Sequence, residues 1–188
     1  MNFSLRALTV AAMISAASIG GAMAQDNPMV GGAAMFADKN IVENAVNSAD
    51  HTTLVAAVQA AGLVETLSGE GPFTVLAPVN AAFDALPAGT VDTLLLPENK
   101  DMLATILACH VIPAKALSTD IVGMVEADGG EHVVDTVGGC KLTLKSENGG
   151  VTVTDENGTV ANVTIADVIQ SNGVIHVIDA VLTPKSAM

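Results

Sequence analysis

The apolar residues of this chain change their spacing halfway along, and this change constrains the fold more than any other feature of the sequence. In the first half they recur every three or four residues, which places side chains on one face of a helix. In the second half they alternate with polar residues, which is the pattern of a strand with one buried face. A chain with helices first and strands afterwards is predicted to form an α+β domain.

Glycine, proline and polar residues divide the helical half into short segments. Gly62 is predicted to end a helix, because glycine readily takes the left-handed conformation found at helix C-termini. Asn80 is predicted as the N-cap of one or two helical turns that Pro87 ends. The segment PFTVLAP (72–78) is β-branched and apolar between two prolines, which predicts a short buried strand. The predicted helices cover residues 41–46, 54–61, 80–87, 90–96 and 98–108.

The strand half contains three alternating segments, CKLTLKS (140–146), VTVTD (151–155) and TVANVTI (159–165), separated by two turns rich in Asn and Gly. This arrangement predicts two consecutive hairpins. The run VIHVIDAVL (174–182) is apolar on both faces and is predicted to be a central strand. The expected architecture is therefore a single α+β domain that ends in consecutive hairpins.

The first 24 residues have the features of a secretory signal peptide. Arg6 gives a positive start, an apolar run rich in alanine follows over 7–19, and Ala22-Met23-Ala24 is a cleavage signal of the small-x-small type. The apolar run is shorter than the ~20 residues that a membrane-spanning helix needs. We therefore expect an exported protein, periplasmic or extracellular, with no membrane span in the mature chain.

The mature chain is long enough for one domain with a substantial core. Its start, residues 25–38, is rich in Gly and Ala without periodicity and is predicted to be a flexible lead-in, so that structure begins near Lys39. A domain over 39–184 and a C-terminal tail over 185–188 complete the predicted organisation.

The composition argues against several classes of partner. The chain has 7 basic and 20 acidic residues, a formal net charge of −13, whereas nucleic acids and anionic membranes bind clustered Lys and Arg. It has no Trp or Tyr, so it lacks the aromatic faces on which sugars and single-stranded bases stack. The motifs of phosphate-binding loops, zinc proteases and serine hydrolases are absent from the sequence, and no cofactor is predicted.

Three segments together suggest a family. GPFTVLAPVNAAFDALP (71–87), ILACHVIP (106–113) and NGVIHVIDAVLTP (172–184) resemble, in order and spacing, the conserved segments of the fasciclin domain family. The opening NIVENAVNSADHTTLVAAVQAAGLVETLSGEGPF (40–73) resembles the helical start of that family, so the likeness covers about residues 39–184. A lone domain after a signal peptide is similar to the small exported bacterial form.

The resemblance implies short helices packed on a wedge of β-sheet, and a function in adhesion or surface interaction. It marks Asn80, His110, His176 and Asp179 as positions that define the fold. The family often has Tyr before the histidine of its middle motif, a pair implicated in adhesion in some animal members, and Cys109 stands there in this chain. The segment His110, Val111, Ile112 and Pro113 is the contact segment that the resemblance implies. The family often has Thr where this chain has Val79.

The two cysteines, Cys109 and Cys140, are predicted to form a disulfide, because an exported chain with an even number of cysteines folds in an oxidising compartment. Two free thiols, a metal site or a catalytic cysteine are the alternatives. Adjacent residues of an extended segment point to opposite faces, which counts against Cys109 and His110 as a reactive pair. The other histidines, His51, His132 and His176, are scattered without the paired spacing of a zinc site.

His176 and Asp179 lie within the apolar run 174–182. A histidine in a buried strand is predicted to be a core residue with hydrogen-bonded ring nitrogens. Asp179 is predicted to accept hydrogen bonds from backbone N–H groups or to form a turn. Neither a catalytic residue nor a metal ligand is predicted at these positions.

The sequence supports three hypotheses about function. The first is an exported, non-enzymatic adhesion or interaction module, monomeric or weakly oligomeric, whose partner is a protein or a cell-surface component. The second is a periplasmic module that binds a small apolar molecule or a lipid in a cleft between the helices and the sheet. The third is a hydrolase, which would need a Ser or Asp beside His110 or His176 in the fold.

Overall fold

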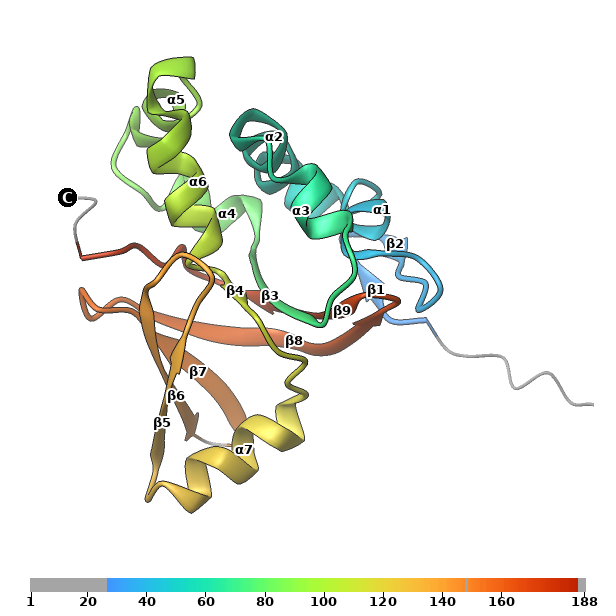
Figure 1. The fold of residues 1–188 in the computed structure, drawn as a ribbon, viewed down its shortest axis with the longest axis vertical. Coiled ribbons are helices and arrows are strands. Elements are labelled where there is room, and N and C mark those ends of the chain that lie inside the picture. The colour runs from blue at the N-terminus through green and yellow to red at the C-terminus, as the bar shows by residue number, and fades with distance from the viewer. Residues whose placement is uncertain (1–26, 148, 186–188) are drawn as a thin grey trace, which may run out of the picture.

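The computed structural model describes residues 27–147 and 149–185 (Figure 1), so the predicted signal peptide lies outside the described residues. The α+β class is confirmed. The helices are α1 (Ile41–Ala45), η1 (Ala49–His51), α2 (Thr52–Ala61), α3 (Val64–Ser68), α4 (Asn80–Asp84), α5 (Thr90–Leu94), η2 (Pro97–Asn99), α6 (Lys100–Ala108) and α7 (Ser118–Ala127). The strands are β1 (Met29–Val30), β2 (Ala33–Ala34), β3 (Phe73–Pro78), β4 (Val111–Ile112), β5 (Glu131–Asp135), β6 (Lys141–Glu147), β7 (Gly150–Thr154), β8 (Val160–Gln170) and β9 (Gly173–Ile178).

Seven strands form one sheet in the order β4-β3-β9-β8-β7-β6-β5, and β1 and β2 form a separate antiparallel pair. The predicted hairpins β6–β7 and β7–β8 are confirmed. Strands β3 and β9 are parallel, with Val75 opposite Ile175, and every other neighbouring pair in the sheet is antiparallel. The last strand of the chain therefore lies in the middle of the sheet, between β3 and β8.

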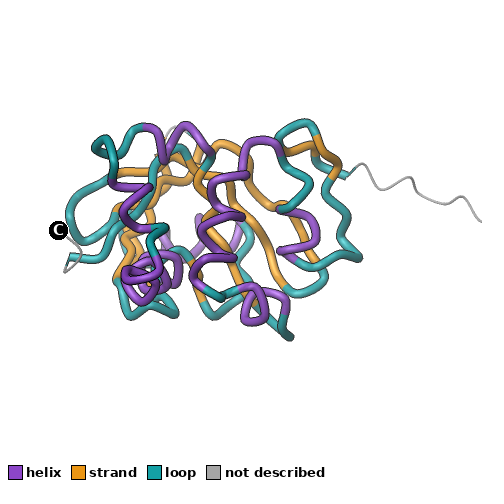
Figure 2. Tube along the Cα trace, turned by 90° about the horizontal axis from the view of Figure 1, so that it is seen from above, coloured by secondary structure: helices purple, strands orange, loops and turns teal. Residues whose placement is uncertain are grey.

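The strands at the centre of the sheet carry apolar residues on both faces, and each face has its own core. Helices α1 to α6 lie at one end of the molecule, where they pack on Val75 and Val177, while α7 packs on the opposite face with Leu76 and Ile178 (Figure 1). Figure 2 shows from above how the helices lie over the strands. The fold thus consists of a helical lobe and a β-wedge that share β3, β9 and β8.

Two features fix the ends of the opening helices, and the first of them was predicted from the sequence. Gly62 ends α2 in the left-handed conformation, at φ 74°, as predicted for a helix C-terminus. The start of α1 is fixed by a capping box, in which Asn40 and Glu43 each accept the other's backbone N–H at 2.9 Å. The opening segment is therefore bounded by a side-chain cap at Asn40 and by the left-handed backbone of Gly62.

Three predictions about secondary structure were incomplete. Structure begins before Lys39, because β1 and β2 pair and bury Val30 and Met35 in the core of the helical lobe. Helix α7 and strand β5 occupy a stretch to which no element was assigned. The central strand ends at Ile178, and the chain leaves the sheet at Asp179. None of the helices described in 27–147 and 149–185 combines the length and apolar character needed to cross a lipid bilayer.

Candidate functional site

A disulfide joins Cys109, at the end of α6, to Cys140, just before β6. Their Cα atoms are 5.3 Å apart, within the usual range for such a bond. Both residues are buried. The turn before Cys140 packs on the helix end, where the N–H of Gly138 donates to the carbonyl of Ala108 at 3.0 Å. The disulfide therefore connects the helical lobe to the β-wedge.

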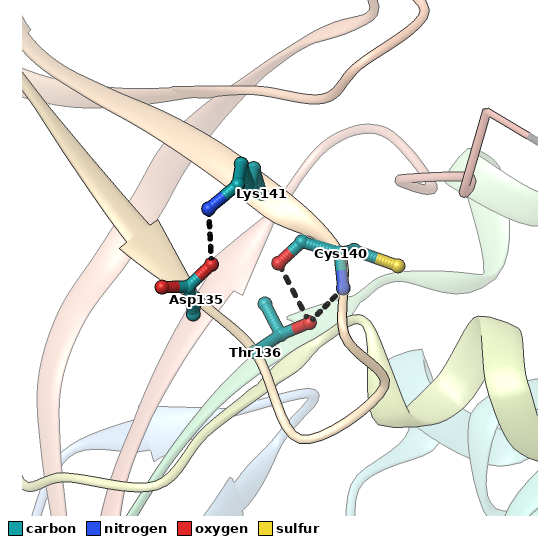
Figure 3. Close-up of polar contacts among 4 residues, drawn as sticks. All are labelled: Asp135, Thr136, Cys140 and Lys141. Atoms are coloured by element: carbon teal, nitrogen blue, oxygen red, sulfur yellow. Dashed lines mark hydrogen bonds and ion pairs between the residues drawn. The ribbon is translucent and has the colours of Figure 1, made fainter.

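Thr136 holds the turn that carries Cys140 (Figure 3). Its Oγ1 accepts the N–H of Cys140 at 3.0 Å and donates to the carbonyl of Cys140 at 3.1 Å. The backbone N–H of Thr136 donates to the same carbonyl at 2.9 Å. On the two strands that leave the turn, Lys141 Nζ lies 2.7 Å from Asp135 Oδ1. The backbone of Cys140 is thus fixed by the turn itself, which presents its side chain to Cys109.

His110 is a structural histidine whose two ring nitrogens are both used. Its Nδ1 donates to the carbonyl of Ile106 at 2.8 Å, and its Nε2 accepts the N–H of Leu182 at 2.9 Å. Burial lowers the pKa of His110 to about 4, although the hydrogen bond to Ile106 opposes this shift. The neutral ring therefore ties α6 to the C-terminal segment of the domain.

His176 has the same character on β9. Its Nε2 donates to the carbonyl of Ala116 at 2.9 Å and its Nδ1 accepts the N–H of Asp167 at 3.2 Å. Burial lowers the pKa of His176. Asp179, which follows β9, accepts the backbone N–H of Asn162 at 2.7 Å and the side-chain amide of Asn162 at 2.8 Å. Both residues hold neighbouring segments of the chain together.

The prediction that Asn80 caps its own helix was wrong. Asn80 is the first residue of α4, and Val79 occupies the N-cap position. The side chain of Asn80 instead reaches the start of α2, where its Oδ1 accepts the N–H of Thr53 at 3.0 Å and its Nδ2 donates to the carbonyl of Ala49 at 2.9 Å. The sequence gives no local sign of this role, because the two helices lie far apart along the chain.

The contact segment from His110 to Pro113 is not an exposed surface. The side chains of His110, Val111 and Ile112 are buried, and Pro113 is the exposed member. Strand β4 pairs with β3, and its Val111 packs in the core of the helical lobe, while Cys109, just before this segment, is bonded to Cys140. Contact through these side chains would require the core to open.

His51 was not predicted as a site residue from the sequence, and it lies with Ser48 against a cavity in the helical lobe. The Oγ of Ser48 and Nδ1 of His51 are 2.8 Å apart, and both residues are buried. The Nε2 of His51 is buried without a hydrogen-bond partner. The spacing of serine and histidine, three residues apart, was the one signal in the sequence that could have drawn attention to the pair.

The described residues do not assemble a metal or hydrolase centre. Across 27–147 and 149–185, no three His, Cys, Asp or Glu side chains lie close enough to hold a metal ion. The ring nitrogens of His110 and His176 bond to backbone groups, so neither is placed to take a proton from a serine hydroxyl. The His51 ring contacts Ser48 but has no carboxylate bonded to its other nitrogen to orient it.

Comparison with known proteins places these features in a wider group. The profile of the Fasciclin domain matches residues 49–184. Protein sll1483 of Synechocystis sp. is 49% identical over 160 residues, which cover 85% of this chain and 82% of that protein. The immunogenic protein MPB70 of Mycobacterium bovis is 35% identical over 147 residues, which cover 76% of this chain and 67% of that protein.

Longer proteins contain a similar domain. The transforming growth factor-beta-induced protein ig-h3 of Sus scrofa is 43% identical over 133 residues, which cover 71% of this chain but 17% of that protein. Among solved structures, a FAS1 domain pair from the insect cell adhesion molecule Fasciclin I is similar, with 25% sequence identity and a TM-score of 0.51. That similarity covers 67% of this chain and 42% of the insect chain. Less than half of the domain pair is therefore matched, which corresponds to about one of its two domains.

Proposed function

Because this chain belongs to the fasciclin domain family, we propose that it is an exported module that works by contact with a protein or a cell-surface component. The observation that carries this proposal is the match of the family profile over residues 49–184, which include both cysteines of the disulfide and the seven strands of the main sheet. The insect relative of known structure comes from a cell adhesion molecule, which supports a contact function. Fold and function are separate matters, so the contact surface has to be argued from this chain's own residues.

The use of the polar core residues supports a function without catalysis. His110, His176 and Asp179 stand at the family's conserved segments, and each bonds to backbone groups of another segment. Catalytic groups keep at least one atom free for a substrate within a pocket. These residues instead use their polar atoms to hold segments of the fold together, which is what an interaction domain requires.

The face of the β-wedge opposite α7 is the surface that we propose for contact. Val133, Thr143, Thr154 and Val160 lie opposite one another on four successive strands, β5 to β8. The two valines are 52% and 53% exposed. Helix α7 covers the other face, where Val134 packs, so the row of Val133 lies on the side without a helix.

Charge also favours this face. The chain carries a net charge of −13, which opposes close approach to other acidic surfaces. On the wedge face, Glu131 pairs with Lys145 at 3.2 Å and Asp135 pairs with Lys141 at 2.7 Å, on either side of Val133. These pairs balance the charges on either side of Val133, and an apolar row between balanced charges suits a protein partner.

Cross-linking capture from the producer's own envelope tests the proposal. Three proteins are compared: the native mature chain, a Val133→Lys/Val160→Lys variant, and Val46→Lys, which alters a valine of equal exposure, 52%, on the helical lobe. The native chain and Val46→Lys are expected to capture the same partner, while the wedge variant captures at least about fivefold less, because a lysine in an apolar contact costs about 1 kcal/mol or more.

Two results would count against the proposal. If the native chain captures no specific partner, the proposed contact function is contradicted. Equal capture by the native chain and the wedge variant would show that the contact surface does not lie on β5–β8. Export is checked separately, by the N-terminal sequence of the protein recovered from the envelope, which should begin at Gln25.

A further inference from the structure

The helical lobe contains a cavity of about 80 Å³ between its helices and the sheet. Val75 of β3, Val168 of β8 and Ile175 of β9 line its floor. Val30 and Met35, from the segment of β1 and β2, contribute to its wall and are buried. Most of the remaining lining residues are apolar as well, so the cavity differs in character from an open, polar groove on the surface.

Within the described part of the chain, His51 supplies the buried side-chain atom of the lining, Nε2, that lacks a regular hydrogen-bond partner. The polar residues of the lining are Ser48, His51, Gln59 and His110. The hydroxyl of Ser48 bonds to Nδ1 of His51, His110 uses both ring nitrogens, and the side chain of Gln59 is exposed. His51 is only 4% exposed, and its Nε2 makes no hydrogen bond of full geometry, although the carbonyl of Ala77 is close enough to raise the pKa of the ring as a weak hydrogen-bond acceptor.

An unpartnered buried nitrogen is unfavourable, and water is poorly suited to relieve it. Leaving a buried polar group without a partner costs about 1 to 3 kcal/mol. The cavity has room for roughly two waters at liquid density, but a buried water needs about three hydrogen bonds. Here Nε2 offers one and the nearby Ala77 carbonyl at most a second, and the valine, isoleucine and leucine side chains offer none. A molecule that is mostly apolar and has one hydrogen-bonding group matches this lining better.

We propose that the cavity binds a small neutral molecule with an alkyl body and one hydroxyl group, and that the hydroxyl bonds to Nε2 of His51. A hydroxyl can both donate and accept, so it suits either tautomer of the ring that Ser48 permits. An engineered apolar cavity of about 150 Å³ accommodates benzene, so by the same proportion the space of about 80 Å³ takes roughly three non-hydrogen atoms, and the rest of an alkyl body lies among the half-buried residues at the rim. This inference goes beyond the contact function and does not depend on it.

The charge state of the site favours a neutral ligand. Burial lowers the pKa of His51, and the nearby Ala77 carbonyl and Asp50 carboxylate oppose that shift only in part. The ring is therefore neutral near pH 7. A carboxylate ligand would lose its hydration in an apolar lining without meeting a positive charge, which is strongly unfavourable.

The route into the cavity lies among the first three α-helices. The members of the lining that are half-buried or exposed are Val42, Ala45, Val55, Gln59 and Val64, all of which belong to α1, α2 and α3. These helices are short, and α1 has five residues. A ligand with a longer chain can thus place its hydroxyl end against His51 and extend between the helices toward solvent.

Methyl NMR of the full mature chain with isobutanol as the probe tests the proposal. Isobutanol is expected to shift the methyl signals of Val75 and Ile175 in a saturable manner at millimolar concentrations, as a ligand of this size allows. It should also shift the Nε2 signal of His51, whereas isopentane, of the same shape without the hydroxyl, should shift the methyl signals alone.

Three variants locate the binding. Ala45→Leu fills the rim of the cavity and should abolish the methyl shifts, while Ala56→Leu, on the exposed side of α2, should leave them unchanged. His51→Leu removes the hydrogen-bonding nitrogen. It should weaken isobutanol about fivefold relative to isopentane, as expected for one hydrogen bond.

Three results would overturn the proposal. The first is the absence of saturable methyl shifts with isobutanol in the native chain. The second is equal loss of isobutanol and isopentane binding in His51→Leu, since His51 would then not anchor the hydroxyl. The third is a long-lived water detected at Nε2 that isobutanol does not displace. If His51→Leu fails to fold, Ala45→Leu and the Nε2 signal still decide the matter.

Discussion

Asn80 caps a helix to which it does not belong: its Oδ1 accepts the N–H of Thr53, in the first turn of α2, at 3.0 Å. A free N–H at a helix start is normally satisfied by the residue just before the helix, but His51 at that position makes no such bond. Removing an N-cap side chain costs about 1 kcal/mol, within a range of 0.5 to 2. We expect Asn80→Ala to destabilise the domain by about that amount or slightly more, because the bond to Ala49 is lost as well.

Urea denaturation measures this change, and Asn47→Ala is the control. Asn47 also donates its side-chain amide to a backbone carbonyl, that of Glu43 at 2.7 Å, but at an exposed site within one segment. We expect its replacement to change the free energy of unfolding by less than about 0.5 kcal/mol. Equal losses for the two variants would show that Asn80 does not cap α2.

The disulfide should be a large contributor to stability. It closes a loop with a sequence separation of 31 residues, and cross-linking such a loop restricts the unfolded chain. The loop-entropy relation gives about 3 to 4 kcal/mol. We expect the Cys109→Ala/Cys140→Ala variant to lose that much in urea denaturation. Alkylation followed by intact-mass measurement checks the bond directly, and two alkylated cysteines in the native exported protein would contradict it.

The domain should lose stability in mild acid through His110. Because its pKa is about 4 in the folded protein and about 6.5 in the unfolded chain, the unfolded state binds the proton more readily. The contribution of the neutral ring is therefore complete above about pH 6.5 and is lost progressively down to about pH 4, by an amount on the order of 3 kcal/mol. Burial lowers the pKa of His51 and His176 as well, so they act in the same direction.

NMR of the histidine rings separates this effect from that of the carboxylates. We expect the His110 ring to stay neutral with its proton on Nδ1 at pH 5, because Nδ1 donates to Ile106 and Nε2 accepts from Leu182. A His110 ring that takes up its proton near pH 6.5 while the protein is folded would refute the prediction.

Two glycines should respond to alanine with opposite signs. A Cβ on Gly138 would lie 2.8 Å from the backbone nitrogen of Cys109 and 2.9 Å from the carbonyl carbon of Ala108. Gly138→Ala must push the turn away from α6, and we expect a loss of about 1 to 3 kcal/mol. In α7, a Cβ on Gly123 meets no atom within 4 Å, so Gly123→Ala should gain about 0.5 to 1 kcal/mol. Thermal denaturation of both variants checks the signs.

Much of the fold could be predicted because the relevant forces are local. The alternation of Leu142 and Leu144 with polar residues matches the buried and outward faces of β6. The hairpins follow from turns within a few residues of each strand. Helix α7 was missed because its apolar residues Ile121 and Val125 face a sheet that forms later in the sequence, so their spacing alone was a weak signal.

The candidate site could not be predicted to the same extent, because its contacts join distant segments. The free nitrogen of His51 depends on how η1 packs against β3, and the cavity depends on the cover formed by Val30 and Met35. The lead-in that contains them has no periodic pattern, since a pair of two-residue strands is too short to show one. The burial of Val111 and Ile112 likewise follows from neighbours that their own segment does not specify.

The position of β9 has a consequence for the order in which this chain can fold during its synthesis. The residues of β9 emerge from the ribosome about 100 positions after their partners in β3, yet they fill the gap between β3 and β8. Until β9 is present, the core of the helical lobe lacks Ile175 and Val177, and Val75 and Ala77 of β3 have no partner strand on that side. A chain that ends a few residues before Gly173 would lack the centre of its sheet, so the sheet can be completed only when nearly the whole chain is available.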